Sequence, residues 1–386
     1  MRNFFINFLI ILLFIRNSFE IAERLGCQDE NGDMVDWFYL YKLPSKYSHI
    51  SNSGLEYLYI TPHSSSLSSW TKSIKLINST ESMPGRTLSI IYNKSHNHDL
   101  LFAMYNDEHP NGDVDTKRGH TKGVVVANDI SGFWLVHSVP KFPPAADEEK
   151  YDYPHTGKIY GQSFLCISFT AEQIGIVGKQ LQYNEPAFYS SQVPKYLEHI
   201  HPQVVEALKM KEIKSAPFYH IATLRSRHGT IFTSYAKSKA FNKELYEDFV
   251  APNYLAGDFY VESWQHGRGN IKSDCTKPTK VYNIKDVSIH GSDFGNDDKI
   301  IFETLKDHSK WLVSKENNLT CIGDINRQEH QKVRGGGTVC LKNITISNIY
   351  TKSIESSEPC IKNQFKKYLP VKKTSKNIKL YFDILV

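Results

Sequence analysis

The chain has 386 residues, of which 40% are hydrophobic and 23% are charged. This composition is typical of a globular protein with enough apolar side chains for a core, and it excludes disordered and fibrous classes. The net charge is +5 with neutral histidines, and the 16 histidines would add positive charge on acidification. An anionic partner at acid pH is one interpretation of this balance, and a surface on which histidines are merely common is the other.

Residues 1–22 are typical of a secretory signal peptide. Arg2 precedes an apolar run at 4–15 that is too short to cross a membrane as a helix. The cleavage site is expected between residues 18 and 26. No later run is long enough to span a bilayer, so we expect a soluble protein of the secretory pathway without a membrane anchor.

Six cysteines follow this leader, and no pair has the C-x-x-C spacing of a zinc or redox motif. An even number of cysteines behind a leader predicts disulfides, but the spacing leaves the pairing open. Four N-x-S/T sequons predict glycosylation at Asn78, Asn93, Asn318 and Asn343.

Strand-like segments, rich in Val, Ile and aromatic residues, come first along the chain, at 37–42, 57–61, 100–105, 123–127, 133–138 and 164–169. Helical patterns follow at 171–182 and 194–209. A second series begins near residue 218, with strands at 219–225, 230–235 and 259–264 and a helix at 242–254. This mixture predicts an α/β fold.

The two series share their order of features. Each opens with paired strands, passes through a helix and reaches an aromatic-rich strand, and each then has a loop that contains H-x-K. We interpret them as a duplicated half, with an N-terminal half at 27–212 and a C-terminal half at 213–386. Two unrelated α/β domains are the alternative.

The H-x-K motif occurs three times, which is not far above what the composition predicts by chance. His120 and His308 each lead into an apolar segment, whereas His330 lies in a polar stretch and is interpreted as a solvated loop. Residues i and i+2 of a strand point to the same face. His120 with Lys122, and His308 with Lys310, can therefore each present an imidazole and an ammonium group in one cleft.

Two such pairs suit the cleavage of a phosphodiester. A neutral imidazole can attack phosphorus, and a protonated imidazole can donate to the leaving oxygen. The two lysines can stabilise the charge on the non-bridging oxygens. This chemistry requires no metal and no other cofactor.

Several longer motifs together resemble the deoxyribonuclease II family, a family of acid, metal-independent endonucleases. They include Arg118-Gly-His-Thr-Lys-Gly123 and the segments 36–38, 39–44, 105–107, 132–140, 160–162, 307–311, 321–327 and 334–338. The resemblance runs from about Cys27 to Cys360. It implies a phospholipase D-like pseudo-dimer of two similar sheet-and-helix halves with the active site between them. It also implies double-stranded DNA as the substrate and products with 3′-phosphate and 5′-hydroxyl ends.

The same resemblance implies a set of site residues and disulfides. The catalytic residues would be His120, Lys122, His308 and Lys310, without an indication of which histidine is the nucleophile. Phosphate binding or histidine orientation would fall to Asn106, His137, Ser138, Asp324, Asn326 and Arg334, for which a structural turn or cap is the alternative. The implied disulfides are Cys27–Cys166, Cys275–Cys360 and Cys321–Cys340.

Two other functions compete with an active nuclease. A secreted DNA-binding protein of the same fold could have weak or lost catalysis, although both H-x-K pairs are intact. A different phosphodiesterase, such as a phospholipase, is disfavoured by the flanking motifs. The sequence leaves open whether the protein is lysosomal or secreted, and whether it is a monomer with internal pseudo-two-fold symmetry.

Overall fold

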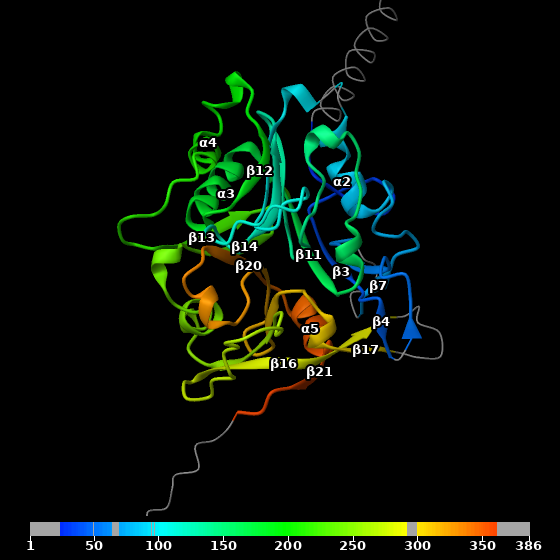
Figure 1. Cartoon of the computed structure of the whole chain (residues 1–386), viewed down its shortest axis with the longest axis vertical. Coiled ribbons are helices and arrows are strands. Elements are labelled where there is room, and N and C mark those ends of the chain that lie inside the picture. The colour runs from blue at the N-terminus through cyan, green and yellow to red at the C-terminus, as the bar shows by residue number, and fades with distance from the viewer. Residues whose placement is uncertain are drawn as a thin grey trace, which may run out of the picture.

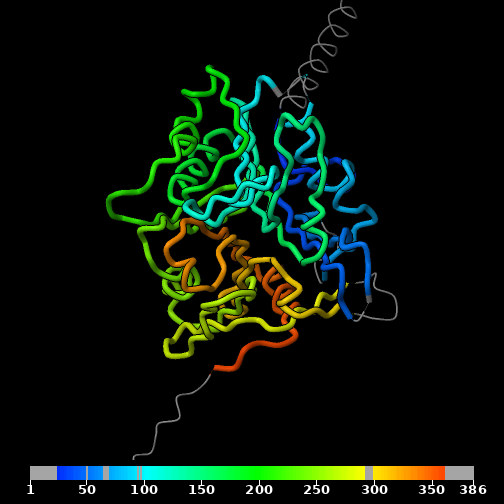
Figure 2. The backbone as a smooth tube through the Cα atoms, viewed as in Figure 1, coloured from blue at the N-terminus to red at the C-terminus, as the bar shows by residue number. Residues whose placement is uncertain are grey.

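The structure is a computed structural model that describes residues 24–360, apart from 49, 64–68, 94, 96 and 292–298. The predicted signal peptide and residues 361–386 lie outside the described residues. Two large β-sheets organise the rest of the chain (Figure 1). The elements coloured yellow to red gather in the lower part of Figure 2.

The first sheet has eight strands, and all neighbouring strands in it are antiparallel. Their spatial order is β12 (Phe188–Gln192), β8 (Leu101–Asn106), β9 (Lys122–Ala127), β10 (Ser131–His137), β11 (Gln162–Thr170), β3 (Trp37–Lys42), β6 (Tyr57–Ile60) and β7 (Thr71–Lys72). Two short pairs lie beside it, namely β1 (Cys27–Gln28) with β2 (Met34–Val35) and β4 (Lys46–Tyr47) with β5 (Ile50–Ser51).

The second sheet has nine strands from the later part of the chain. Eight follow the order β13 (Tyr219–Arg225), β14 (Ile231–Lys237), β20 (Gly336–Lys342), β19 (Leu319–Gly323), β18 (Trp311–Ser314), β15 (Gly257–Glu262), β16 (Thr279–His290) and β17 (Lys299–Glu303). The ninth, β21 (Ile354–Ser357), pairs with β16. The pair β15–β16 is parallel.

Five antiparallel strands have the same order in both sheets. The series β3-β11-β10-β9-β8 of the first sheet corresponds to β14-β20-β19-β18-β15 of the second, both in space and along the chain. A helix follows the last strand of each series, α3 (Ala171–Asn184) after β11 and α5 (Ile344–Lys352) after β20. The mixed sheet-and-helix fold agrees with the predicted α/β class.

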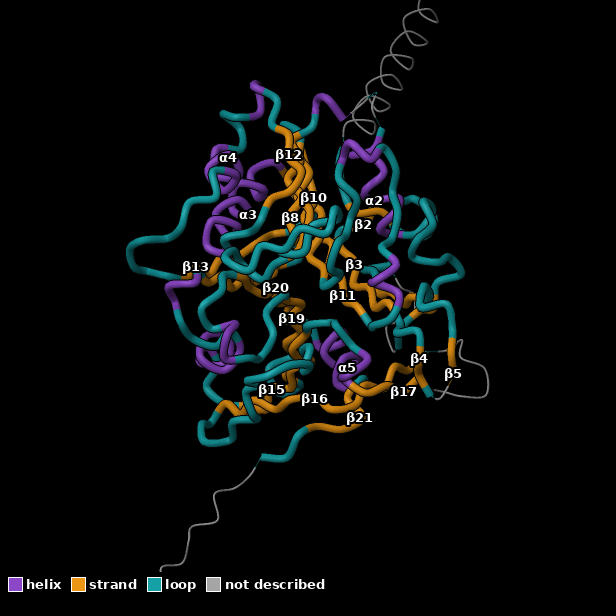
Figure 3. Tube along the Cα trace, in the orientation of Figure 1, coloured by secondary structure: helices purple, strands orange, loops and turns teal. Residues whose placement is uncertain are grey.

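The core lies on both faces of each sheet because strand side chains alternate in direction. Trp37 and Tyr39 of β3 join a cluster that includes Trp311 and residues of α3 and α5, so the two sheets share one core. Phe38 and Leu40 point to the opposite face, where α2 (Met83–Tyr92) packs. Figure 3 shows α2 on one side of the first sheet and α3 with α4 (Pro202–Leu208) on the other.

Two predicted helices are wrong in extent. The segment 194–209 contains a short 3-10 helix, Lys195–Leu197, and then α4, which begins only at Pro202. Proline disfavours a helical residue before it, and His201 accordingly has φ −120° and ψ 51°. The segment 242–254 forms a π-helix, Tyr246–Val250, and a 3-10 helix, Ala251–Asn253.

Three disulfides are present: Cys27–Cys166, Cys275–Cys360 and Cys321–Cys340. They are the pairs that the family resemblance implies. The first joins β1 to β11, and the third joins β19 to β20, where Cys321 and Cys340 lie directly opposite each other. The segment between β19 and β20 is therefore tied at its two flanking strands.

Candidate active site

The two H-x-K pairs lie at corresponding places in the two sheets. Lys122 is the first residue of β9, and Lys310 directly precedes the corresponding strand β18. His120 is 7% exposed and His308 8%, and both lysines are 1% exposed. We call His120 with Lys122 the N-terminal half-site and His308 with Lys310 the C-terminal half-site.

Each histidine is held by the other half of the molecule. Nδ1 of His120 lies 2.5 Å from the carbonyl oxygen of Asp324, and Nδ1 of His308 lies 2.9 Å from that of Ser138. Asp324 directly follows β19 and Ser138 directly follows the corresponding strand β10. The two half-sites thus support each other reciprocally across the interface between the sheets.

The backbone N–H groups of the two histidines also donate to carbonyls of the other half. The N–H of His120 donates to the carbonyl of Gly335 at 2.9 Å, and that of His308 to the carbonyl of Gly161 at 2.8 Å. Gly335 precedes β20 and Gly161 precedes β11, which are again corresponding strands. A side chain at position 335 would collide with the backbone of Asn184 at the end of α3. The close packing of Gly335 against Asn184 therefore requires glycine.

These contacts assign the reactive ring nitrogen. A carbonyl oxygen can only accept a hydrogen bond, so each Nδ1 carries a proton and the neutral ring keeps its lone pair on Nε2. Lys310 Nζ also lies 3.1 Å from Nδ1 of His308, but the ammonium donates to the backbone carbonyl of that histidine. Nε2 is therefore the nitrogen available for proton transfer or attack in both half-sites.

A carboxylate completes only the N-terminal half-site. Asp107 forms a buried ion pair with Lys122 and a second one, at 3.2 Å, with Arg334 of the C-terminal half. Its Oδ2 lies 3.9 Å from Nε2 of His120. Burial alone would raise the pKa of Asp107, but Lys122, His120 and Arg334 hold it below its ordinary value. Asp107 is thus ionised even at acid pH.

An aromatic side chain occupies the corresponding place in the C-terminal half-site. Asn106 lies opposite Lys122, and Asp107 directly follows Asn106. Glu262 lies opposite Trp311, so continuing this register by one residue places Ser263 opposite Lys310, and Trp264 directly follows Ser263. The Trp264 ring meets the His308 ring edge to face, with centroids 4.9 Å apart. Trp264 also stacks on the exposed His266 at 4.1 Å.

Burial and positive charge control the protonation of the two imidazoles. Burial first, and then Lys122, lowers the pKa of His120 well below its ordinary value. Burial, Lys310 and Lys122 do the same to the pKa of His308. Burial also raises the pKa of Asp324 to about 7 and lowers that of Lys310 well below its ordinary value. Both histidines of the free site are therefore neutral unless the pH is clearly acid.

The remaining predicted residues support the backbone around the site. Ser138 Oγ donates to Gln162, and Asp324 Oδ1 accepts the N–H of Gly337 at 2.9 Å. Asn106 donates to two carbonyls of the loop after β10, at 2.9 and 3.0 Å. His137 packs between Phe142 and Phe164, and Asn326 is buried with its Oδ1 unpaired.

Arg334 contacts the opposite half of the molecule. Besides its ion pair with Asp107, it donates to the carbonyls of Arg118, Asp115 and Gly119 at 2.9 to 3.2 Å. Its guanidinium group thus clamps the loop that carries His120. His330, the histidine of the third H-x-K, is exposed in a short 3-10 helix, as predicted for a solvated segment.

Sequence reasoning missed two further lysines that are completely buried. Lys42 ends β3 and Lys237 ends the corresponding strand β14. Lys42 donates to the carbonyl of Lys158 at 3.0 Å, and Lys237 donates to three carbonyls between 331 and 334 at 2.5 to 3.1 Å. Each holds the loop whose final glycine accepts the N–H of a motif histidine. The sequence signal for these two residues is a lysine at the end of each of two otherwise mostly apolar strand segments.

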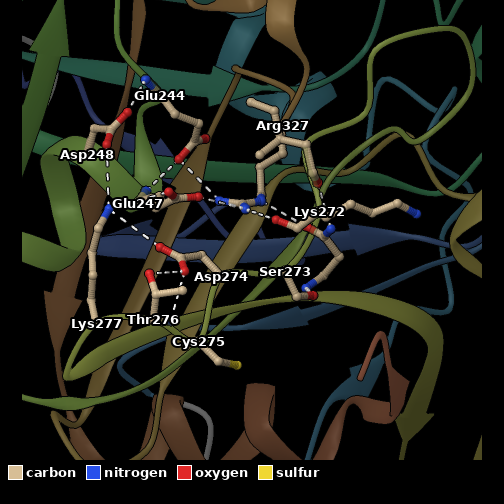
Figure 4. A network of polar contacts seen from close by, with 12 residues as sticks. Glu244, Glu247, Asp248, Lys272, Ser273, Asp274, Cys275, Thr276, Lys277 and Arg327 are labelled. Atoms are coloured by element: carbon tan, nitrogen blue, oxygen red, sulfur yellow. Dashed lines mark hydrogen bonds and ion pairs between the residues drawn. The ribbon is translucent and has the colours of Figure 1, made fainter. Parts of the chain in front are cut away.

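A second polar network anchors the segment after β19. Arg327 is buried and pairs with Glu244 and Glu247, both at 3.2 Å, and it also donates to the carbonyl of Lys272. Figure 4 shows this network, in which Lys277 connects the same acidic segment to Asp274, beside Cys275. The network thus fixes Arg327 three residues after Asp324, whose carbonyl holds His120.

Other predicted features are distributed over the surface. Asn78, Asn93 and Asn318 are exposed, whereas Asn343 is half-buried and caps α5 through its Oδ1.

Within the described ranges, no helix has both the length and the apolar composition needed to span a membrane. The same part of the chain contains no group of three or more His, Cys, Asp or Glu side chains that could hold a metal ion.

Comparisons with known proteins identify the family of this chain. The family model for deoxyribonuclease II matches residues 26–360. The chain is 38% identical to human deoxyribonuclease-2-beta over 349 residues, which cover 88% of this chain and 92% of the relative. It is 37% identical to plancitoxin-1 of Acanthaster planci over 346 residues, with 88% and 93% coverage, and 34% identical to mouse deoxyribonuclease-2-alpha over 344 residues, with 88% and 95% coverage. The chain therefore belongs to the deoxyribonuclease II family.

Proposed function

We propose that the protein is an acid endodeoxyribonuclease that hydrolyses double-stranded DNA without a divalent metal, to 3′-phosphate and 5′-hydroxyl ends. The observation that carries this proposal is the reciprocal pair of buried histidines, each with its Nδ1 proton on a carbonyl of the other half. Both rings keep Nε2 for chemistry, and a lysine accompanies each ring. Membership in the deoxyribonuclease II family supplies DNA as the substrate class.

The proposed reaction has two displacements. One histidine attacks phosphorus through Nε2, while the other, protonated, donates to the leaving 5′ oxygen. Water then cleaves the phosphohistidine and releases the 3′-phosphate. Lys122 and Lys310 stabilise the charge on the non-bridging oxygens, so the four side chains supply the nucleophile, the acid and the charge stabilisation.

The proposed arrangement is a phospholipase D-like pseudo-dimer of residues 27–212 and 213–386. The five corresponding strands, the helix after each series and the corresponding carbonyls that hold the histidines support it. In this arrangement neither half has a complete site alone. Ser138, Asp324 and Arg334 act as supports that reach across the interface, whereas Asn106 and His137 shape the loop after β10.

An acid pH dependence follows from the histidine environment. One ring must be protonated to donate, and burial lowers the pKa of both rings. Activity should therefore rise as the pH falls below the ordinary histidine value and decrease towards neutrality. An acidic destination fits this dependence, and disulfides form in an oxidising compartment. We accordingly propose a secretory-pathway protein, secreted or lysosomal.

Plasmid nicking at about pH 5 in excess EDTA tests the proposal, since histidines titrate in this range. The wild-type protein should nick the plasmid and leave 3′-phosphate ends, and His308→Ala should lose this activity. His330→Ala is the matched control, because it removes an exposed H-x-K histidine and should retain activity. Nicking that needs added Mg²⁺ would contradict the metal-independent mechanism. DNA binding without nicking would favour a binding protein with lost catalysis.

A further inference from the structure

The two half-sites differ in the charge that faces their histidines. His120 faces the carboxylate of Asp107, 3.9 Å from its Nε2, together with the cations Lys122, Arg334 and Lys310. His308 faces Lys310, Lys122 and His120, which are all cationic when protonated. Each ring therefore has cations around it, and the carboxylate is the element that distinguishes them.

The carboxyl groups on the C-terminal side are directed elsewhere. Asp307 accepts hydrogen bonds from the hydroxyl groups of Tyr41 and Ser309, and Glu262 accepts one from Thr304. The place that corresponds to Asp107 is occupied by Trp264, whose ring packs edge to face with His308. An apolar ring beside an imidazole favours its neutral form, and a carboxylate favours its cationic form.

We infer that Asp107 is a positioning residue that makes His120 the general acid and so leaves His308 as the nucleophile. This inference rests on the proposed nuclease function and divides the work between its two histidines. Asp107 acts through His120, because its carboxylate stabilises the imidazolium that must donate. Its ion pairs with Lys122 and Arg334 hold the carboxylate in place from both halves of the molecule.

The two displacements conserve atoms, protons and electron pairs. The Nε2 lone pair of neutral His308 forms a bond to phosphorus, the bond from phosphorus to the 5′ oxygen breaks, and that oxygen takes the Nε2 proton of His120. Neutral His120 then accepts a proton from water while the water oxygen bonds to phosphorus. The bond between phosphorus and Nε2 breaks, and its electron pair returns to His308. The net change is the addition of one water molecule.

A leaving group that needs no proton separates the two roles. Replacing the 5′ bridging oxygen of an oligonucleotide by sulfur gives a thiolate leaving group, whose conjugate acid has a pKa of about 8.5 rather than that of an alcohol. The variants are His120→Asn and His308→Asn, since asparagine retains an N–H donor for the supporting carbonyl. Circular dichroism and oligonucleotide binding establish that each variant folds and binds its substrate.

The expected results are opposite for the two variants. On the oxygen substrate, both should lose about 10²-fold or more in rate. On the sulfur substrate, His120→Asn should recover most of the wild-type rate, whereas His308→Asn should stay inactive. Recovery of His308→Asn alone would reverse the assignment and leave the nuclease proposal intact. Recovery of both variants, or of neither, would also overturn the division of roles. A folded wild-type protein that cleaves neither substrate would instead overturn the proposed function.

Asp107→Asn gives a second readout that a purely structural role would not move. This variant should lose about tenfold on the oxygen substrate, with kcat falling more than KM changes, and its acid limb should move to lower pH. Sulfur substitution should restore its rate, as for His120→Asn. Equal losses on both substrates would show that Asp107 only holds the fold. Trp264→Phe is the matched control at the corresponding place and should respond equally to both substrates.

Discussion

The N-terminal and C-terminal half-sites have one backbone frame and different side-chain surroundings. In both, a histidine just before a corresponding strand donates its Nδ1 proton to a carbonyl of the other half. They differ where Asp107 faces the first ring and Trp264 packs on the second. Corresponding strands of the two sheets thus leave the same ring nitrogen free in both histidines, while a single position gives the rings different charge environments. Two identical groups can then perform two different tasks.

The largest expected effect comes from removing either ring of the pair. His120→Ala, His308→Ala and the double variant should each lose about 10⁴-fold in kcat on plasmid DNA, because a nucleophile and an acid act as a unit. The double variant should be no more than a few-fold worse than either single variant. Independent, multiplying losses, measured by single-turnover cleavage at acid pH, would show that the half-sites work separately.

The buried lysines Lys42 and Lys237 test how strongly each half-site depends on the loop that supports its histidine backbone. Lys237→Met should destabilise the fold by about 1–3 kcal/mol, because up to three carbonyls that accept from Lys237 lose their donor. Lys42→Met should cost less, because among the described residues Lys42 donates to the carbonyl of Lys158 alone. Urea denaturation at acid pH measures both values. Equal stability of the two variants would indicate that the loops are held by other contacts.

Replacing Trp264, the aromatic residue beside His308, should decrease kcat less than removing either histidine. Trp264→Ala removes an edge-to-face contact with His308, and such contacts contribute about 0.5–1.5 kcal/mol, which corresponds to a roughly 2- to 10-fold decrease in kcat. Trp264→Phe keeps an aromatic ring and should retain most of the activity. Steady-state cleavage of plasmid DNA by the two variants measures this difference. Activity equal to wild type in Trp264→Ala would remove Trp264 from the positioning of His308.

A pH-dependent effect concerns the carboxyl group of Asp324, whose backbone carbonyl holds His120. Burial raises the pKa of its carboxyl group from 3.8 to about 7, so the folded protein binds more protons there than the unfolded chain between these values. This contribution to stability is present below about pH 4 and is lost as the pH rises through about 7. The histidines, with lowered pKa values, act in the opposite direction.

Asp324→Asn isolates the carboxyl group from those histidines. Asparagine keeps an oxygen that accepts the N–H of Gly337, but its side chain does not titrate. The stability of the variant should therefore decrease less than that of wild type as the pH rises from about 4 to about 7. Thermal melting across this range gives the difference between the two slopes. Parallel slopes would indicate that Asp324 titrates near its ordinary value in the fold.

Local patterns determined much of what the sequence predicts correctly. The strands at 37–42 and 219–225 appear as predicted. The residue pattern that indicates a strand depends only on residues that are neighbours in the sequence. The H-x-K motifs and their apolar continuations were equally local. Helix extent was less secure, since one proline at 202 divides a segment whose periodicity alone indicates a continuous helix.

Only the tertiary structure decided how the two half-sites differ. Asp107 and Trp264 correspond through the register of β8 with β9 and of β15 with β18, and no spacing along the chain relates them. The carbonyls of Ser138 and Asp324 carry no side-chain signature, so their contacts with the opposite histidines could not be read from residue types. Hydrogen bonds between segments 170 and 204 residues apart depend on how the sheets pack. The sequence by itself determined which chemical groups are present, and the packing of two sheets around a shared core determined what each group faces.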